Sequence, residues 1–159
     1  MSRLESFRRR LSAQIDGLNW AIEQACEIKG DFLDLGLGNG RSYDHLRCYS
    51  SRRIWVVDRM LQCHPDCVPP KQDFLQGEAD DMLDKLAARG GRIALAHYDL
   101  GFGNNELDKS EAARLSPFIA SVMVPDGVIL SSQPLVGFTQ IAGPDTIAPD
   151  RYMFYRMPG

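Results

Sequence analysis

The chain has 159 residues, of which 44% are hydrophobic and 25% charged, and its formal net charge is −3. These values predict one globular domain with a buried core, and they exclude the basic field that binds nucleic acid or anionic lipid. No apolar run reaches the ~18 residues of a membrane span, and no secretory signal is visible, so we expect a cytoplasmic protein whose four cysteines are reduced thiols.

The first predicted element is a helix over residues 3–27, within an N-terminal helical segment of residues 1–29. Its apolar residues recur every three or four positions, which is typical of a helix that packs one face on a sheet. They are Leu4, Phe7, Leu11, Ile15, Leu18 and Ile22.

A glycine-rich turn follows the first predicted strand, residues 32–35. Glycines occupy every second position from Gly36 to Gly40, and a helix then runs to about Cys48. Turns of this kind bind a nucleotide at the carboxyl end of a parallel strand. The third glycine of the dinucleotide fingerprint G-x-G-x-x-G would fall on Arg41, which cannot provide its close packing. The turn therefore argues against NAD.

An acidic residue ends the second predicted strand, residues 53–58. Asp58 lies about 20 residues after the glycines, where an acid accepts hydrogen bonds from ribose hydroxyls. Three prolines in the crossover 59–71 exclude a long helix there.

The remaining elements continue the alternation of strands and helices. Strands are predicted at 73–76 and 92–99, with a helix up to Arg89 between them. A helix over 105–123, interrupted at Pro117, and a turn at 125–127 lead to a fifth strand at 128–131. This order predicts an α/β fold with a doubly wound, mostly parallel sheet.

The turn from Asp34 to Gly40, with an acid before three alternate glycines, resembles that of the class I, Rossmann-like S-adenosylmethionine-dependent methyltransferases. The resemblance implies S-adenosyl-L-methionine as cofactor, and a role for Glu78 and Ala79 beside the adenine. The alternative for Glu78 is that acids here simply stabilise a helix N-terminus. The implied cofactor-binding residues are Asp34, Gly36, Leu37, Gly38, Asn39, Gly40, Asp58, Arg59, Glu78 and Ala79.

Both ends of the chain match the family less closely than the core, residues 31–131. Residues 134–159 predict a β-hairpin from 135–141 and 152–157, with a reduced last helix. In related methyltransferases an N-terminal helix covers the cofactor or substrate, so Trp20 is an alternative pocket wall. No insertion is long enough for a substrate domain, which favours a small acceptor or a site completed by a second subunit in a homo-oligomer.

The candidate catalytic residues lie at the end of the fourth predicted strand. Asp99 is the first candidate for a general base and His97 the second. The sequence lacks the Pro-Pro-aromatic run of enzymes that methylate amino groups of bases or glutamine, and the Asp-Asn pair of metal-dependent O-methyltransferases. We expect no bound metal, although His45, Cys48, Cys63 and Cys67 form two pairs with short spacing.

Three functions stay open at this point. The first is a methyltransferase that uses S-adenosyl-L-methionine on a small acceptor. The second is a non-catalytic protein that binds the same cofactor, suggested by the reduced C-terminal part. The third is an NAD-dependent oxidoreductase, which Arg41 disfavours.

Overall fold

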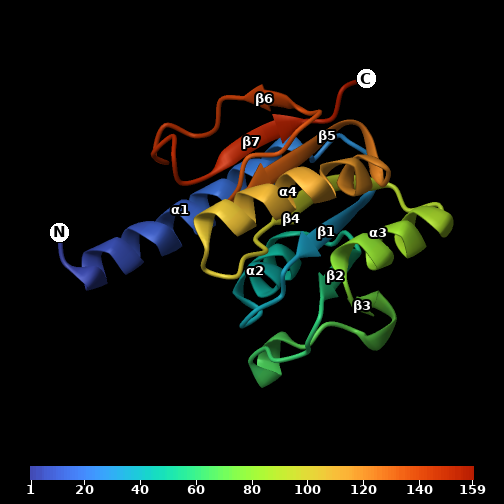
Figure 1. Ribbon diagram of the computed structural model, residues 1–159, viewed down its shortest axis with the longest axis horizontal. Coiled ribbons are helices and arrows are strands. Elements are labelled where there is room, and N and C mark those ends of the chain that lie inside the picture. The colour runs from blue at the N-terminus through green and yellow to red at the C-terminus, as the bar shows by residue number, and fades with distance from the viewer.

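The computed structural model describes residues 1–159, and a seven-stranded sheet organises them (Figure 1). The strands are β1 (Asp31–Leu35), β2 (Ile54–Asp58), β3 (Phe74–Gln76), β4 (Ile93–Tyr98), β5 (Met123–Ser131), β6 (Thr139–Ile141) and β7 (Met153–Arg156). The helices are α1 (Arg3–Gln24), α2 (Arg41–Tyr49), α3 (Ala79–Ala88) and α4 (Asn105–Ala120), and two short 3-10 helices span Pro65–Cys67 and Lys71–Asp73.

The strand order is β3-β2-β1-β4-β5-β7-β6, with β7 antiparallel to its neighbours. This arrangement confirms the predicted doubly wound, mostly parallel sheet with a C-terminal hairpin. The chain order reverses between β1 and β4, and such a switch point opens a crevice at the carboxyl ends of the strands.

Helices cover both faces of the sheet, as Figure 1 shows. Side chains of α1 and α2 pack on one face, and those of α3 and α4 pack on the other. The central strands are apolar on both faces because both are buried, as parallel strands require. None of the helices combines the length and apolar character that crossing a membrane demands.

The buried face of α1 differs from the predicted apolar stripe. Leu4, Phe7 and Ile15 are 77%, 41% and 47% exposed, whereas the buried residues are Ala13, Gly17, Leu18 and Ala21. A Cβ on Gly17 would lie 3.3 Å from the methyl groups of Leu130. Small residues therefore let α1 lie close to β5, and this contact overrides the spacing of the larger side chains.

Two other predicted boundaries were wrong. Helix α4 is not interrupted at Pro117 but continues to Ala120. Pro117 cannot donate the backbone hydrogen bond to the Ala113 carbonyl, and Ala113 is exposed, so water can replace this donor. Strand β5 begins at Met123 rather than after the predicted turn 125–127. Backbone hydrogen bonds join Asp126 and Gly127 to Met157, so the end of the chain draws this turn into the sheet.

No helix follows β5, as the sequence predicted. Instead, the segment between β5 and β6 packs on the face of the sheet that α3 and α4 cover, where Leu135 is buried in the core. The Leu135 amide donates to the Tyr155 hydroxyl at 3.1 Å, and the Val136 amide donates to Ser116 Oγ at 2.9 Å. These two bonds fix the segment in place of the reduced helix.

Candidate functional site

The glycine-rich turn lies between β1 and α2, and its three glycines have positive φ angles of 100°, 50° and 88°. A Cβ on Gly36 would lie 2.6 Å from the Asp99 carbonyl oxygen, and one on Gly40 would overlap the side chain of Cys67. A Cβ on Gly38 would meet no protein atom within 4 Å. The outer glycines therefore permit close packing, and the middle one leaves space open.

Asp58, at the end of β2, holds this turn. Its Oδ2 accepts hydrogen bonds from the amides of Leu37 and Gly38, at 2.8 and 3.2 Å. Its Oδ1 accepts from the Met60 amide at 3.2 Å. An ionised carboxylate offers about four acceptor positions, so one remains for a ligand. The strand pattern did not predict this second role of Asp58, which is to stabilise the glycine-rich turn.

A cavity of about 440 Å³ lies over the turn. It follows the carboxyl ends of β1, β2, β3 and β4, and α1 and the approach to β7 form part of its wall. The predicted site residues that line it are Gly36, Leu37, Gly38, Asn39, Asp58, Arg59, Glu78, Ala79 and Asp99. Its size is that of a small-molecule site.

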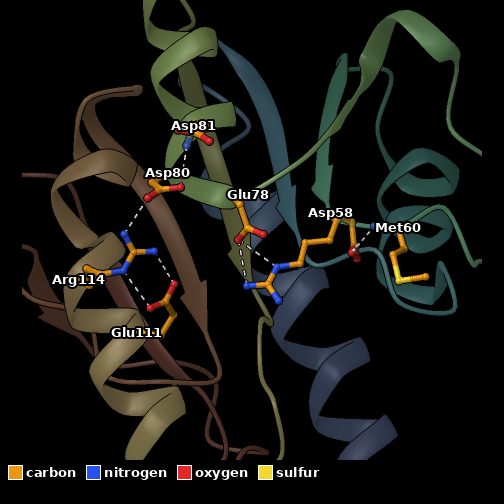
Figure 2. A network of polar contacts seen from close by, with 8 residues as sticks. Asp58, Met60, Glu78, Asp80, Asp81, Glu111 and Arg114 are labelled. Atoms are coloured by element: carbon orange, nitrogen blue, oxygen red, sulfur yellow. Dashed lines mark hydrogen bonds and ion pairs between the residues drawn. The ribbon is translucent and has the colours of Figure 1, made fainter.

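One end of the cavity carries paired charges. The Arg59 guanidinium binds Glu78 at 2.9 Å and lies 5.0 Å from the ring centre of Phe102. Beside it, Arg114 of α4 binds Asp80 at 2.8 Å and Glu111 at 2.6 Å, and so ties α4 to the start of α3 (Figure 2). Both cations at this end already have carboxylate partners.

Asp34 and His97 lie beneath the cavity rather than in it. Both side chains are 0% exposed, and His97 Nδ1 lies 2.8 Å from Asp34 Oδ1. Ser42 Oγ donates to the other Asp34 oxygen at 2.9 Å. Asp34 is thus engaged inside the fold by His97 and by Ser42 of α2, and neither Asp34 nor His97 lines the cavity. Gly40, another predicted cofactor-binding residue, does not line the cavity either.

Burial alone would lower the pKa of His97. The hydrogen bond and negative charge of Asp34, with the charge of Asp99, outweigh burial and raise this pKa above its usual value. His97 Nε2 has no hydrogen-bond partner, and the ring lies 6.1 Å from that of Tyr152.

Asp99 follows β4 directly, is exposed, and lines the cavity. Near it the cavity wall includes polar side chains that strand and turn patterns did not predict: Arg10, Gln14, Ser132, Arg151 and Tyr152. Arg10 and Gln14 belong to α1. Of the predictions made from the sequence, only the alternative in which an N-terminal helix covers the site indicated that this helix would line the cavity. Trp20, the wall named in that alternative, instead packs against Phe154 with ring centres 4.8 Å apart.

The cysteines and histidines of the two short-spaced pairs do not gather into a group of three or more metal-binding side chains. His45 Nε2 lies 2.7 Å from the side-chain oxygen of Asn19, while Cys48 is exposed. Cys63 and Cys67 lie beside Gly40. They pack the crossover 59–71 against the glycine-rich turn.

The site fits a ligand with a nucleoside and a charged, non-phosphate tail. The open space above Gly38 admits a ligand close to the backbone, and Asp58 has an acceptor position left for a hydroxyl. Five carboxylates line the cavity beside four arginines, and a carboxylate suits a cationic group better than a pyrophosphate.

Comparison with known proteins agrees with this chemistry. Residues 1–157 match the family described as S-adenosyl-L-methionine methyltransferase. The crystal structure of an S-adenosyl-L-methionine methyl transferase from Silicibacter pomeroyi DSS-3 is 34% identical, with a TM-score of 0.92 and 99% of both chains covered. A comparison with curated proteins gives no match.

More distant structures share the fold. CalS11, a TDP-rhamnose 3'-O-methyltransferase of calicheamicin biosynthesis, is 16% identical with a TM-score of 0.58, covering 97% of this chain and 80% of its own. Human methyltransferase-like protein 13, in complex with SAH, is 12% identical with a TM-score of 0.51 and the same coverage.

Proposed function

Because this chain belongs to the S-adenosyl-L-methionine methyltransferase family, we propose that its cavity holds the cofactor at the paired-charge end and the methyl acceptor beside Asp99. The protein is an S-adenosyl-L-methionine-dependent methyltransferase. When bound, the cofactor supplies a methyl group already activated by a sulfonium. The observation that carries the proposal is that the glycine-rich turn, Asp58, Glu78 and Asp99 all line one cavity.

The residues of the chain chiefly position the reactants. Alignment of a nucleophile with the group it attacks can lower a barrier by ~7–11 kcal/mol. The turn amides are already held by Asp58, and the ends of β1 and β4 are joined by the hydrogen bond from the Asp99 amide to the Leu35 carbonyl, at 2.9 Å. Both halves of the cavity therefore rest on the rigid sheet, which suits precise alignment.

In the proposed cofactor mode, the free acceptor position of Asp58 takes a ribose hydroxyl. Glu78 and Ala79, at the start of α3, then lie at the adenine, with Arg59 and Phe102 beside them. The Arg59–Glu78 pair is about half exposed on both sides, and an exposed ion pair contributes only ~0–1 kcal/mol. Glu78 can therefore exchange this partner for a ligand at small cost.

Asp58→Ala is expected to weaken binding of S-adenosylhomocysteine, the demethylated cofactor, by about 1.5–3 kcal/mol, the range for a hydrogen bond to a charged group. Isothermal titration calorimetry measures this change. The matched control is Asp81→Ala, which removes an exposed acid of α3 outside the cavity and should leave the affinity unchanged. A folded Asp58→Ala protein with wild-type affinity would remove Asp58 from the cofactor site.

Asp99 is proposed as the general base that takes the proton from a hydroxyl or amine acceptor. A positioned base contributes at least about 100-fold to such a step. Asp99→Asn keeps the shape of the side chain, so kcat should fall about 100-fold while the affinity for S-adenosylhomocysteine is retained. Transfer of a labelled methyl group into metabolite fractions gives the rate. An unchanged rate would mean that the acceptor needs no base at this position.

Three further features belong to this proposal. The acceptor is a small molecule, because the cavity is of small-molecule size. The protein acts in the cytoplasm and associates with copies of itself. The exposed apolar side chains of α1, which are Leu4, Phe7 and Ile15, supply a surface for that association.

A further inference from the structure

Two arginines in the cavity wall have no charged partner. Arg10 and Arg151 line the cavity, and neither guanidinium forms a hydrogen bond or a salt bridge; the guanidinium of Arg10, an exposed residue, lies 5.3 Å from the ring centre of Phe7. By contrast, Arg59, which also lines the cavity, is paired with Glu78, and Arg114 next to the cavity is paired with Asp80 and Glu111. The charge of Arg59 at the cofactor end is thus balanced by a carboxylate, whereas the charges of Arg10 and Arg151 have no ion-pair partner.

Both unpaired arginines lie on the acceptor side. Arg151 immediately precedes Tyr152 and β7, and β7 is separated from β1 by β4 and β5. Arg10 of α1 lines the same cavity as Tyr152, and its positive charge opposes the rise that burial causes in the pKa of the Tyr152 phenol. Arg41, the first residue of α2, also lines the cavity without an ion-pair partner, but it directly follows the glycine-rich turn and so belongs to the cofactor end.

A guanidinium presents five N–H donors in a planar fork that matches the oxygens of a carboxylate or a phosphate. Arg151 is partly buried and lines the cavity, and its guanidinium has no hydrogen-bond partner within the protein, so its donors are free to bind an anionic ligand. Asp99 contributes a negative charge to the same end of the cavity. A matching ligand therefore has an anionic group at the arginines and an uncharged nucleophile at Asp99.

We propose that the methyl acceptor is a small anion whose carboxylate or phosphate group is held by Arg10 and Arg151. The inference rests on the proposed function of the cavity, and it adds the chemical class of the acceptor. It makes Arg10 and Arg151 specificity-determining residues, since both hold the end of the acceptor that does not react.

Binding of simple anions tests the inference without an acceptor in hand. The protein is saturated with S-adenosylhomocysteine and titrated by calorimetry with inorganic phosphate and, separately, with succinate. Either anion is expected to bind, and the tighter one distinguishes a phosphate from a carboxylate. Arg10→Gln and Arg151→Gln should each weaken that binding about tenfold, or ~1.4 kcal/mol.

The matched control is Arg8→Gln, which removes an exposed arginine of α1 outside the cavity and should leave anion affinity unchanged. All three variants should keep wild-type affinity for S-adenosylhomocysteine. In wild-type protein, labelled methyl groups should enter only those metabolites that an anion exchanger retains, and the two cavity variants should raise KM for them.

Two sets of results would overturn the inference and leave the proposed function standing. In the first set, S-adenosylhomocysteine binds normally but one of three results contradicts the inference. The anions do not bind, or they bind the wild-type protein and all variants equally, or labelled methyl groups enter metabolites that the anion exchanger does not retain. The other is loss of S-adenosylhomocysteine affinity in Arg10→Gln, which would assign Arg10 to the cofactor's own carboxylate. Failure of the wild-type protein to bind S-adenosylhomocysteine would instead refute the proposed function.

Discussion

Gly38→Val is expected to abolish binding of S-adenosylhomocysteine while the protein remains folded. Gly38 lines the cavity, and a Cβ there meets no protein atom within 4 Å, so the added side chain would occupy the ligand's space. The φ angle of 50° adds strain, which costs roughly 1–2 kcal/mol of the free energy of unfolding. Calorimetric titration and a melting curve measure the two effects separately.

Gly90→Val is the matched control for that strain. Gly90 has φ 73°, a Cβ there also meets no atom within 4 Å, and the residue lies at the end of α3, outside the cavity. Both variants should lose similar stability, but only Gly38→Val should lose the ligand. A Gly38→Val protein that still binds S-adenosylhomocysteine normally would show that the cofactor does not approach this turn.

Asp34→Ala is expected to lower the free energy of unfolding by about 3–5 kcal/mol, the cost of removing one partner from a buried ion pair. The substitution leaves the His97 imidazole and the Ser42 hydroxyl buried without their acceptor. Urea unfolding at several pH values measures the loss. A loss below about 1 kcal/mol, typical of an exposed pair, would contradict the buried arrangement.

The pH dependence of stability should identify the same pair. Because the folded-state pKa of His97 is raised above its usual value near 6.5, its contribution is fully present below about pH 6.5. The contribution is lost as the pH rises through the folded-state pKa. Asp34→Asn and His97→Gln should both abolish this decline, and a decline that persists in both variants would have another origin.

The parts of the site that follow directly from strand ends were predictable from the sequence. The glycine-rich turn, Asp58 and Asp99 each follow a buried apolar strand, and parallel strands bring their carboxyl ends to one edge. The period of two predicts that His97 and Asp99 lie on one side of a strand, but it carries no information on how deeply each is buried. His97 is inside the strand and buried, whereas Asp99 lies just beyond it and is exposed.

Features that depend on remote contacts were not predictable. The buried face of α1 is determined by the approach of Gly17 to Leu130, and the length of β5 by hydrogen bonds to Met157. Arg10 and Arg151 lie on a polar helix face and in a proline-containing loop. Nothing in their local sequence distinguishes them from solvated surface arginines, since only the folded chain brings them to one cavity.

Two segments far apart in the sequence, around Arg10 and around Arg151, both line the cavity, and this has a consequence for biosynthesis. A chain emerging from the ribosome contains the glycine-rich turn, Asp58, Glu78 and Asp99 well before Arg151 and Tyr152. Translation at ~5–20 residues per second leaves an interval of seconds between these events. During that interval a nascent chain lacks Arg151 and Tyr152, so the part of the cavity wall that these residues form is completed only when the last strands of the sheet have been made.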